Sequence, residues 1–374
     1  MPELASIFGQ DSAVRALQHA LEADSLAGTY LLTGVRGVGK GALARAFAQA
    51  ACCLNPASGP ADSCGECASC RRADSGSQPE IVTIAPAGEW LLIGQFWDRE
   101  GKPGTGALSR SLNYAPVIGR RRAFIVERAE TLTESAANSL LKVLEEPPPY
   151  VLFILLASHT ARVLPTIVSR SQVLRVQPAP VDALARYLSE SHGVDPDRAA
   201  LLAAVAEGRV GQAVTLARSP AVSTEIEQVL DFAESIPGAP PVRALRIAEQ
   251  MRKLAAQIKA LTALDQDTAQ ERDPASPDRA GRVQLAALFD LLLGFYRDLL
   301  AVRVGGQAAE RIVNRNRLER LEALAQLGDP PRWMAALDAI LLARRRLDAN
   351  ANVALVTESL AMSLLGVGAA AERV

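Results

Sequence analysis

Residues 34–41 read Gly34-Val35-Arg36-Gly37-Val38-Gly39-Lys40-Gly41, and the rest of the chain is interpreted around them. They follow the apolar run Tyr30 to Thr33 and precede a helical pattern over residues 42–51. A strand, a glycine-rich turn and a helix in this order are typical of a P-loop, which binds phosphate through backbone N–H groups, a helix N-terminus and a lysine. The candidate nucleotide-binding residues are therefore Gly34, Gly37, Gly39, Lys40 and Gly41.

The P-loop departs from its usual pattern at one position. The residue after the lysine is normally Ser or Thr, because its hydroxyl binds Mg²⁺, and here it is Gly41. A hydrolysing site also needs an acidic residue at the end of a neighbouring strand. The apolar run 123–126 is followed by Glu127 and Arg128, and an arginine cannot act as a base. The loop thus leaves ATP or ADP binding open, and argues against Mg²⁺ and turnover.

Further apolar runs predict the remaining strands of one sheet. Residues 151–157 are apolar without alternation, as in a parallel sheet covered on both faces, and residues 81–84, 123–126 and 172–176 are the other strand candidates. Helical patterns separate them, so the first part of the chain is predicted to be a doubly wound α/β domain. Beyond the proline-rich residues 178–180 only helical periodicity is found, including one helix predicted over residues 196–216.

Cysteines form a second motif. Cys64, Cys67 and Cys70 have C-x₂-C-x₂-C spacing, and Cys53 lies upstream across a turn-rich segment. Four closely spaced thiolates suit a tetrahedral structural Zn²⁺ site with no open ligand position. Free thiols, a redox pair or an iron–sulfur cluster are the alternatives. Cys52 adjoins Cys53 and competes with it as the fourth ligand.

Two further segments carry less specific signals. Arg170, in Ser169-Arg170-Ser171, directly precedes the last predicted strand. It is either an arginine finger that reaches a neighbouring subunit's ATP or a partner in a local salt bridge. Residues 86–106 combine aromatic residues with glycines and are predicted to form a loop anchored by its own aromatic side chains, without an assigned function.

Composition limits the location and partners. The 374 residues are 49% hydrophobic and 22% charged, with a formal net charge of −1, so no overall field attracts DNA. Neither a signal peptide nor an apolar run long enough to span a membrane is visible, and we expect a cytoplasmic protein without membrane contact.

With these motifs in place, the chain resembles clamp-loader subunits of bacterial DNA polymerase III. The helical stretch 135–148, which ends Leu-Leu-Lys-Val-Leu-Glu-Glu-Pro-Pro, is highly specific for that family. The resemblance is firm over residues 7–176 and weaker beyond them. Its other carriers, in chain order, are Gly9-Gln10, the P-loop, the cysteines 53, 64, 67 and 70, and Ser169-Arg170-Ser171.

The resemblance implies a three-part architecture. An AAA+ RecA-like domain over residues 1–178 would carry a zinc module at about 53–70. A small helical lid would follow over 179–220, and an all-α collar over 221–374 would oligomerise. The expected assembly is a hetero-pentamer with gamma/tau motor subunits and a delta subunit, which opens the sliding clamp and places it on primed DNA during replication.

Two branches of the family share these features, an ATP-hydrolysing motor and a delta-prime subunit with a damaged ATP site. The motor has an Asp-Glu pair where this chain has Glu127-Arg128, a hydroxyl where it has Gly41, and a nucleotide-sensing arginine where it has Gly211. These differences favour the delta-prime branch, a stator that is not itself an active ATPase within the polymerase holoenzyme. Arg170 inherits the finger role by position and would act in trans on a neighbour's ATP.

Two alternatives stay open. One is an active gamma/tau-like ATPase motor, and the other is a zinc-containing module that binds nucleic acid or protein beside a vestigial P-loop. The sequence leaves undecided whether nucleotide binds at Lys40, whether DNA touches this chain, and which subunit faces which side.

Overall fold

A computed structural model describes residues 3–55, 61–86, 88–98, 106–262, 277–306, 308 and 312–366. The described chain divides into two compact units. The first contains residues 1–180 and 208–212, and the second contains residues 181–207 and 213–374. The finer division into lid and collar stays a prediction.

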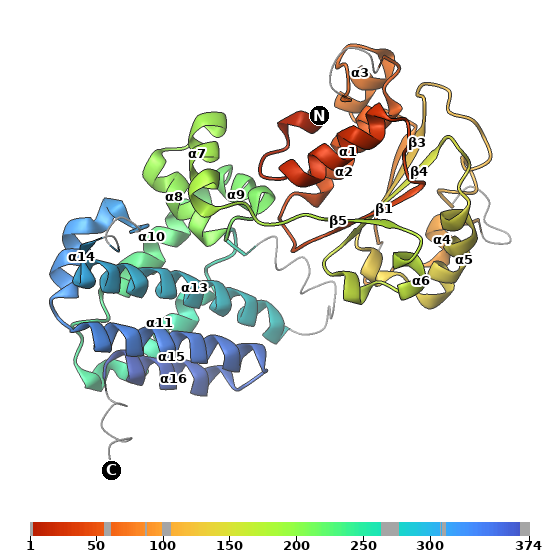
Figure 1. The fold of residues 1–374 in the computed structure, drawn as a ribbon. Helices are drawn as coiled ribbons and strands as arrows, with labels where there is room; N and C mark the ends of the chain where they lie inside the picture. Colours follow the sequence, from red (N-terminus) through yellow and green to blue (C-terminus); the bar gives the residue numbers. More distant parts are fainter. Residues whose placement is uncertain are drawn as a thin grey trace. The chain divides into compact units, whose positions relative to one another are not determined.

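The first unit is built on a five-stranded parallel sheet with the order β2-β3-β4-β1-β5 (Figure 1). β1 lies between β4 and β5, and its Leu31 lies level with Leu155 of β4 and Val173 of β5. Because all strands are parallel, their carboxyl ends meet at one edge, where α/β folds place ligands. The strands are β1 (Thr29–Thr33), β2 (Ile81–Ile84), β3 (Arg122–Val126), β4 (Val151–Ala157) and β5 (Gln172–Arg175).

Helices cover both faces of this sheet, which confirms the predicted α/β class. Tyr30, Leu32 and Ile154 pack on one face with α1 and α2, whereas Leu31 and Phe153 pack on the other with α4, α5 and α6. Each fully buried aliphatic or aromatic side chain contributes about 1.5–3 kcal/mol, so the two apolar layers fix the sheet. The helices of this unit are α1 (Asp11–Glu22), α2 (Lys40–Cys52), α3 (Ala68–Asp74), α4 (Ile93–Phe96), α5 (Glu134–Glu145) and α6 (Pro165–Val168).

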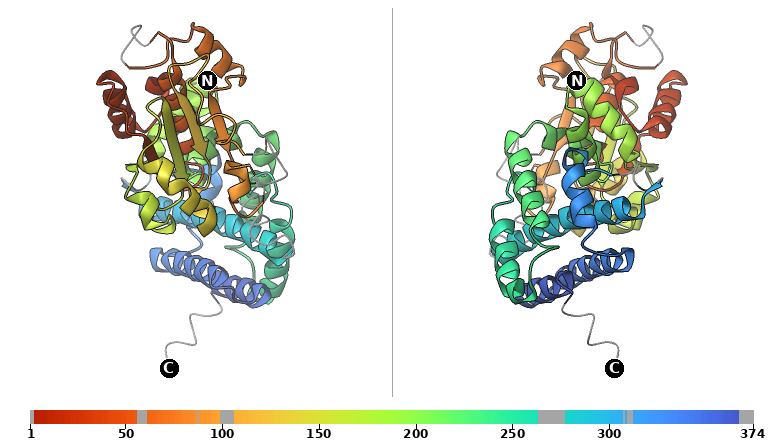
Figure 2. Two further views of the ribbon diagram at one scale, coloured as in Figure 1. Left: turned by 90° about the vertical axis from the view of Figure 1, so that its right-hand side faces the viewer. Right: turned by 90° about the vertical axis from the view of Figure 1, so that its left-hand side faces the viewer.

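The second unit contains helices and no strand in its described residues. Long helices α13 and α15 lie in contact, and Figure 2 gives two further views of them. None of the helices in the described part of the chain is both long and apolar enough to cross a bilayer. The helices are α7 (Val181–His192), α8 (Pro196–Val205), α9 (Val210–Ala217, which begins in the first unit), α10 (Pro220–Glu234), α11 (Ala244–Ala255), α13 (Pro277–Val304), α14 (Leu318–Ala325), α15 (Pro330–Asp348) and α16 (Val353–Leu364).

The single helix predicted over residues 196–216 is wrong. The chain breaks between α8 and α9, where Glu207 and Gly208 both have positive φ angles of 50° and 78°. Left-handed residues cannot continue a right-handed helix, so the direction of the chain changes at this point.

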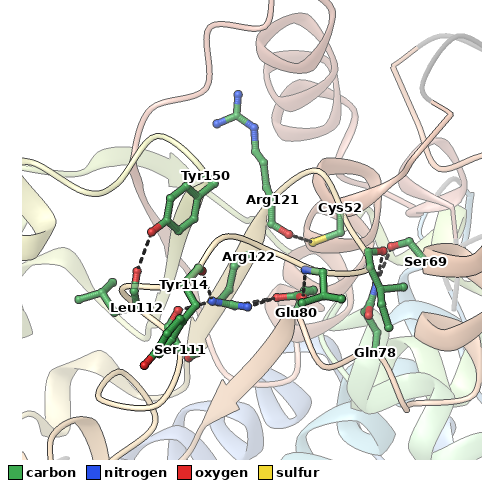
Figure 3. Close-up of polar contacts among 12 residues, drawn as sticks. Cys52, Ser69, Gln78, Glu80, Ser111, Leu112, Tyr114, Arg121, Arg122 and Tyr150 are labelled. Atoms are coloured by element: carbon green, nitrogen blue, oxygen red, sulfur yellow. Dashed lines mark hydrogen bonds and ion pairs between the residues drawn. The ribbon is translucent and has the colours of Figure 1, made fainter.

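A buried ion pair holds the segment that precedes β3 (Figure 3). Glu80 accepts hydrogen bonds from the Arg122 guanidinium (2.7 Å) and from the Val117 N–H (2.7 Å). Arg122 also donates to the carbonyl oxygens of Ser111 and Tyr114. Both charged groups are thus bonded to each other and to backbone groups of the chain.

Candidate functional site

The P-loop connects β1 to α2 at the carboxyl edge of the sheet. Gly37 and Gly39 have φ angles of 79° and 109°, which other residue types rarely adopt, and Gly39 is the residue before the first turn of α2. The Gly34 N–H donates to the Ala157 carbonyl at the end of β4. Gly34, Gly37 and Gly39 therefore lie in the loop, and Lys40 and Gly41 are the first two residues of α2.

The side chain of Lys40 folds back onto this loop. Its Nζ donates to the carbonyl oxygens of Gly34 (2.5 Å) and Val35 (3.0 Å). Burial lowers the pKa of Lys40 to about 8, and the nearby Glu130 carboxylate opposes that shift. The ammonium group is thus satisfied by backbone of its own chain.

The position that would bind Mg²⁺ in an active P-loop faces a cation here. A Cβ added at Gly41 would lie 3.4 Å from Nη1 of Arg45, one turn further along α2. A side chain at residue 41 would therefore begin beside a guanidinium, whose charge repels a divalent ion. The absence of the hydroxyl and the presence of Arg45 act in the same direction.

The Arg128 side chain, just beyond the end of β3, is bonded to the backbone of residues 88–89. Arg128 adopts a left-handed φ of 53°, and its guanidinium donates to the carbonyl oxygens of Gly88 (3.2 Å) and Glu89 (2.9 Å). The carboxylate that acts on Lys40 belongs to Glu130, whose Oε1 accepts the Ser158 N–H (3.1 Å) at the end of β4. Glu130 was missed from sequence because it lies outside the strand-end pair that the motif specifies.

The four predicted cysteines converge. The Sγ atoms of Cys53, Cys64, Cys67 and Cys70 all lie within 4.8 Å of one another. The Cys53–Cys67 and Cys64–Cys70 Sγ distances are 4.0 and 3.9 Å, close to the roughly 3.8 Å edge of a tetrahedron with 2.3 Å Zn–S bonds. Backbone N–H groups of residues 64, 67 and 70 donate to cysteine sulfurs, as in metal-binding loops.

The adjacent cysteines 52 and 53 are both buried and differ in their partners, since Cys53 Sγ lies 4.0 Å from Cys67 Sγ and accepts the Cys64 N–H (3.4 Å). The Cys52 thiol is fully buried and donates to the Arg121 carbonyl (3.0 Å), and burial raises its pKa to about 12. At Cys67 burial opposes ionisation, but N–H donors from Cys70 and Leu54, with the neighbouring thiols, lower the pKa to about 6. Burial raises the pKa values of Cys53 and Cys70, so the fit to a metal rests on the convergence of the four sulfur atoms, and Cys52 lies outside that cluster.

Arg170 lies between α6 and β5 and has a local partner. Its Nε and Nη2 donate to Oε2 of Glu145 at 3.2 and 3.1 Å, and its Nη1 donates to the Thr166 carbonyl (3.1 Å). The arginine side chain is 30% exposed and the glutamate 58%. The local salt bridge considered from the sequence is thus present, in a solvent-accessible form.

The aromatic segment 86–106 is only partly described, since residues 87 and 99–105 lie outside the described residues. Phe96 is fully buried, and the Trp97 indole N–H donates to the Ser139 hydroxyl (3.0 Å) on α5. Its described part packs against the first unit through these aromatic side chains.

The parallel sheet and the P-loop together define a P-loop α/β domain of the AAA+ class. A family model described as "DNA polymerase III, delta subunit" matches residues 9–180. Over 358 residues the chain is 28% identical to the DNA polymerase III subunit delta' of Bacillus subtilis (strain 168), covering 95% of this chain and 96% of that protein. It is 35% identical over 199 residues to the gamma/tau subunit of Mycobacterium tuberculosis (strain CDC 1551), and spans about a third (32%) of that protein. The chain is therefore similar to a bacterial DNA polymerase III delta-prime subunit along nearly its whole length, and to gamma/tau subunits over about half of its length.

Proposed function

We propose that this chain is the stator of a DNA polymerase III clamp loader and that it donates Arg170 to the ATP site of a neighbouring motor subunit. One observation carries the proposal. The Lys40 ammonium is bonded to backbone carbonyls of its own loop, whereas Arg170 is held by one exposed carboxylate and by the Thr166 carbonyl. The chain lacks the groups that bind metal in its own ATP site. It retains the arginine that would complete the ATP site of a neighbouring subunit.

The contact with Glu145 is weak enough for the Arg170 guanidinium to exchange it for another anion. An exposed ion pair contributes about 0–1 kcal/mol, because water screens it and ordering two long side chains costs entropy. A triphosphate offers several anionic oxygens to the same planar guanidinium, and such charge-assisted bonds are roughly twice as strong as neutral ones. Arg170 would exchange Glu145 for a neighbour's γ-phosphate at little cost.

The chain's own P-loop would not turn nucleotide over. Gly41 brings no hydroxyl, Arg45 occupies the neighbourhood of the metal position, and Arg128 points to the 88–89 backbone. Lys40 still offers a charge to phosphate, so ATP or ADP would bind without hydrolysis.

The similarity to a delta-prime subunit supplies the proposed partners. These are gamma/tau motor subunits and a delta subunit in a hetero-pentamer, the sliding clamp, and primed DNA through the complex. Residues 1–178 would form the RecA-like domain, 179–220 the lid, and 221–374 the collar through which the subunits assemble.

We further propose that Cys53, Cys64, Cys67 and Cys70 hold one structural Zn²⁺. The segment between these cysteines also fixes the N-terminus, because the Asp62 carboxylate accepts the N–H groups of Leu4 (2.9 Å) and Ala5 (2.7 Å). Leu4 is fully buried in the first unit's core. The metal would therefore stabilise the fold and take no part in nucleotide chemistry.

Single-turnover ATP hydrolysis by the reconstituted loader tests the arginine. We expect Arg170→Ala to slow hydrolysis at the site it serves by roughly 10³-fold or more. Arg170→Lys should rescue little, since a lysine cannot form the planar bidentate contact. Arg175→Ala is the matched control, because Arg175 is exposed at the end of β5 and has no role here. Unchanged hydrolysis in assembled Arg170→Ala loader would rule out the donor role.

A further inference from the structure

Residues 208–212 return to the first unit after the left-handed turn at Glu207 and Gly208. The Gly208 carbonyl accepts the Ala179 N–H (2.9 Å). A Cβ at Gly208 would lie 2.1 Å from the Ala179 carbonyl oxygen, so only glycine permits this approach. The turn thus fixes the position of residues 209–212 in the first unit.

Gly211 and Gln212 contact the P-loop. The Gln212 N–H donates to the Gly37 carbonyl (3.1 Å), and Gln212 is 5% exposed. A Cβ at Gly211 would lie 2.9 Å from the same carbonyl oxygen, closer than side-chain carbons approach in practice. Gly211 is therefore required for direct backbone contact between the two segments.

The contact between residues 208–212 and the P-loop would take the place of contacts that a nucleotide makes with the loop. Lys40 is bonded to the carbonyls of Gly34 and Val35, and the Gly37 carbonyl is bonded to Gln212. Hydrogen bonds inside the chain thus hold the loop at its start and its middle. An arginine at residue 211 could not adopt this arrangement, because its Cβ would already displace the loop.

We propose that residues 208–212 are a latch that holds the P-loop closed without nucleotide. The P-loop of this subunit would then keep one conformation. Nucleotide binding would neither form nor break its contact with residues 208–212. This inference rests on the proposed non-hydrolysing role and extends it, since a stator should keep one conformation throughout the cycle of its neighbours.

Amide hydrogen exchange on the full chain tests the latch, with and without saturating ADP or ATP. In wild type the Gln212 amide should exchange slowly, and nucleotide should change its rate less than twofold. Gly211→Ala should accelerate that exchange by roughly tenfold, because its Cβ separates the segments, and Gly211→Val should accelerate it further. Gly294→Ala in α13 is the matched control, since a Cβ at Gly294 meets nothing within 4 Å.

Two results would overturn the latch. One is a wild-type Gln212 amide that slows about tenfold when nucleotide is added, and the other is an unchanged rate in both Gly211 variants. A thermal melt of each variant separates local opening from global unfolding. Arg170→Ala should leave Gln212 exchange unaltered, so failure of the latch and failure of the arginine donor are distinguishable.

Discussion

Two arginine–glutamate pairs in the first unit look alike in sequence and differ in surroundings. Arg122 and Glu80 are 7% and 2% exposed and lie 2.6 Å apart, with further bonds to backbone groups of the 111–117 segment (Figure 3). Arg170 and Glu145 are 30% and 58% exposed and lie 3.1 Å apart. The two pairs join the same charged groups, so burial and the additional backbone hydrogen bonds of the Arg122–Glu80 pair separate their roles.

The difference shows which arginine is free to serve another molecule. Breaking a buried pair leaves an uncompensated charge in the interior, at a cost of about 3–5 kcal/mol. Breaking an exposed pair costs about 0–1 kcal/mol, because water takes over both groups. Arg122 is thus committed to the fold, and Arg170 is available for a phosphate.

The largest effect is expected at the buried pair. Arg122→Ala should lower the free energy of unfolding by about 3–5 kcal/mol, since Glu80 is left charged and unpaired in the interior. Denaturant unfolding monitored by circular dichroism measures it. Arg120→Ala is the control, because Arg120 is 45% exposed and lies 3.9 Å from an exposed Asp24. A loss under 1 kcal/mol in Arg122→Ala would erase the contrast between the pairs.

The cysteines extend the comparison to neighbouring residues. Cys67→Ser should abolish binding of one Zn²⁺ per chain and destabilise the first unit by about 3 kcal/mol, because the ligand set is broken. Cys52→Ala should keep the full metal content measured by atomic emission. An equal loss of Zn²⁺ in the Cys67→Ser and Cys52→Ala variants would show that Cys52 also binds the metal, in addition to Cys53.

The pH dependence of stability probes the closed P-loop. The pKa of Lys40 is lowered by burial from 10.5 to about 8, so the unfolded chain holds more protons than the folded chain between these values. Stability conferred by this residue therefore rises as the pH rises from 8 to 10.5. Relative to Lys40→Met, wild type should gain about 1–2 kcal/mol over that range, since partial solvent access reduces the full effect. A flat difference would mean that Lys40 is solvated.

The smallest effect on stability is expected at the exposed pair. Arg170→Ala and Glu145→Gln should each change the free energy of unfolding by less than about 0.5 kcal/mol, because both groups remain hydrated. Denaturant unfolding of the isolated chain provides the measurement. A loss above 2 kcal/mol would make Arg170 a structural residue and weaken its proposed role in trans.

Local patterns predicted much of this molecule. The strands at 81–84 and 151–157 have the predicted bounds, because continuous apolar runs are encoded within a few residues. The cysteine cluster was predicted for the same reason, since three of its four ligands lie within seven residues.

Contacts between distant segments were not predictable. The Glu80–Arg122 pair joins residues 42 positions apart, and the Arg170–Glu145 pair joins residues 25 apart. The influence of Glu130 on Lys40 and the approach of Gln212 to Gly37 depend on strand order and on the turn at Gly208. No local pattern specifies which side chains the sheet brings to its carboxyl edge.

The central claim is that this chain gives an arginine and does not use its own P-loop. The most direct test is clamp- and DNA-stimulated ATP hydrolysis by the reconstituted loader, carrying Lys40→Ala or Arg170→Ala in this subunit alone, with assembly verified. Lys40→Ala should change the rate less than twofold, and Arg170→Ala should lower it at least about tenfold. A crippled Lys40→Ala loader beside a normal Arg170→Ala loader would contradict the account and identify the chain as a working motor.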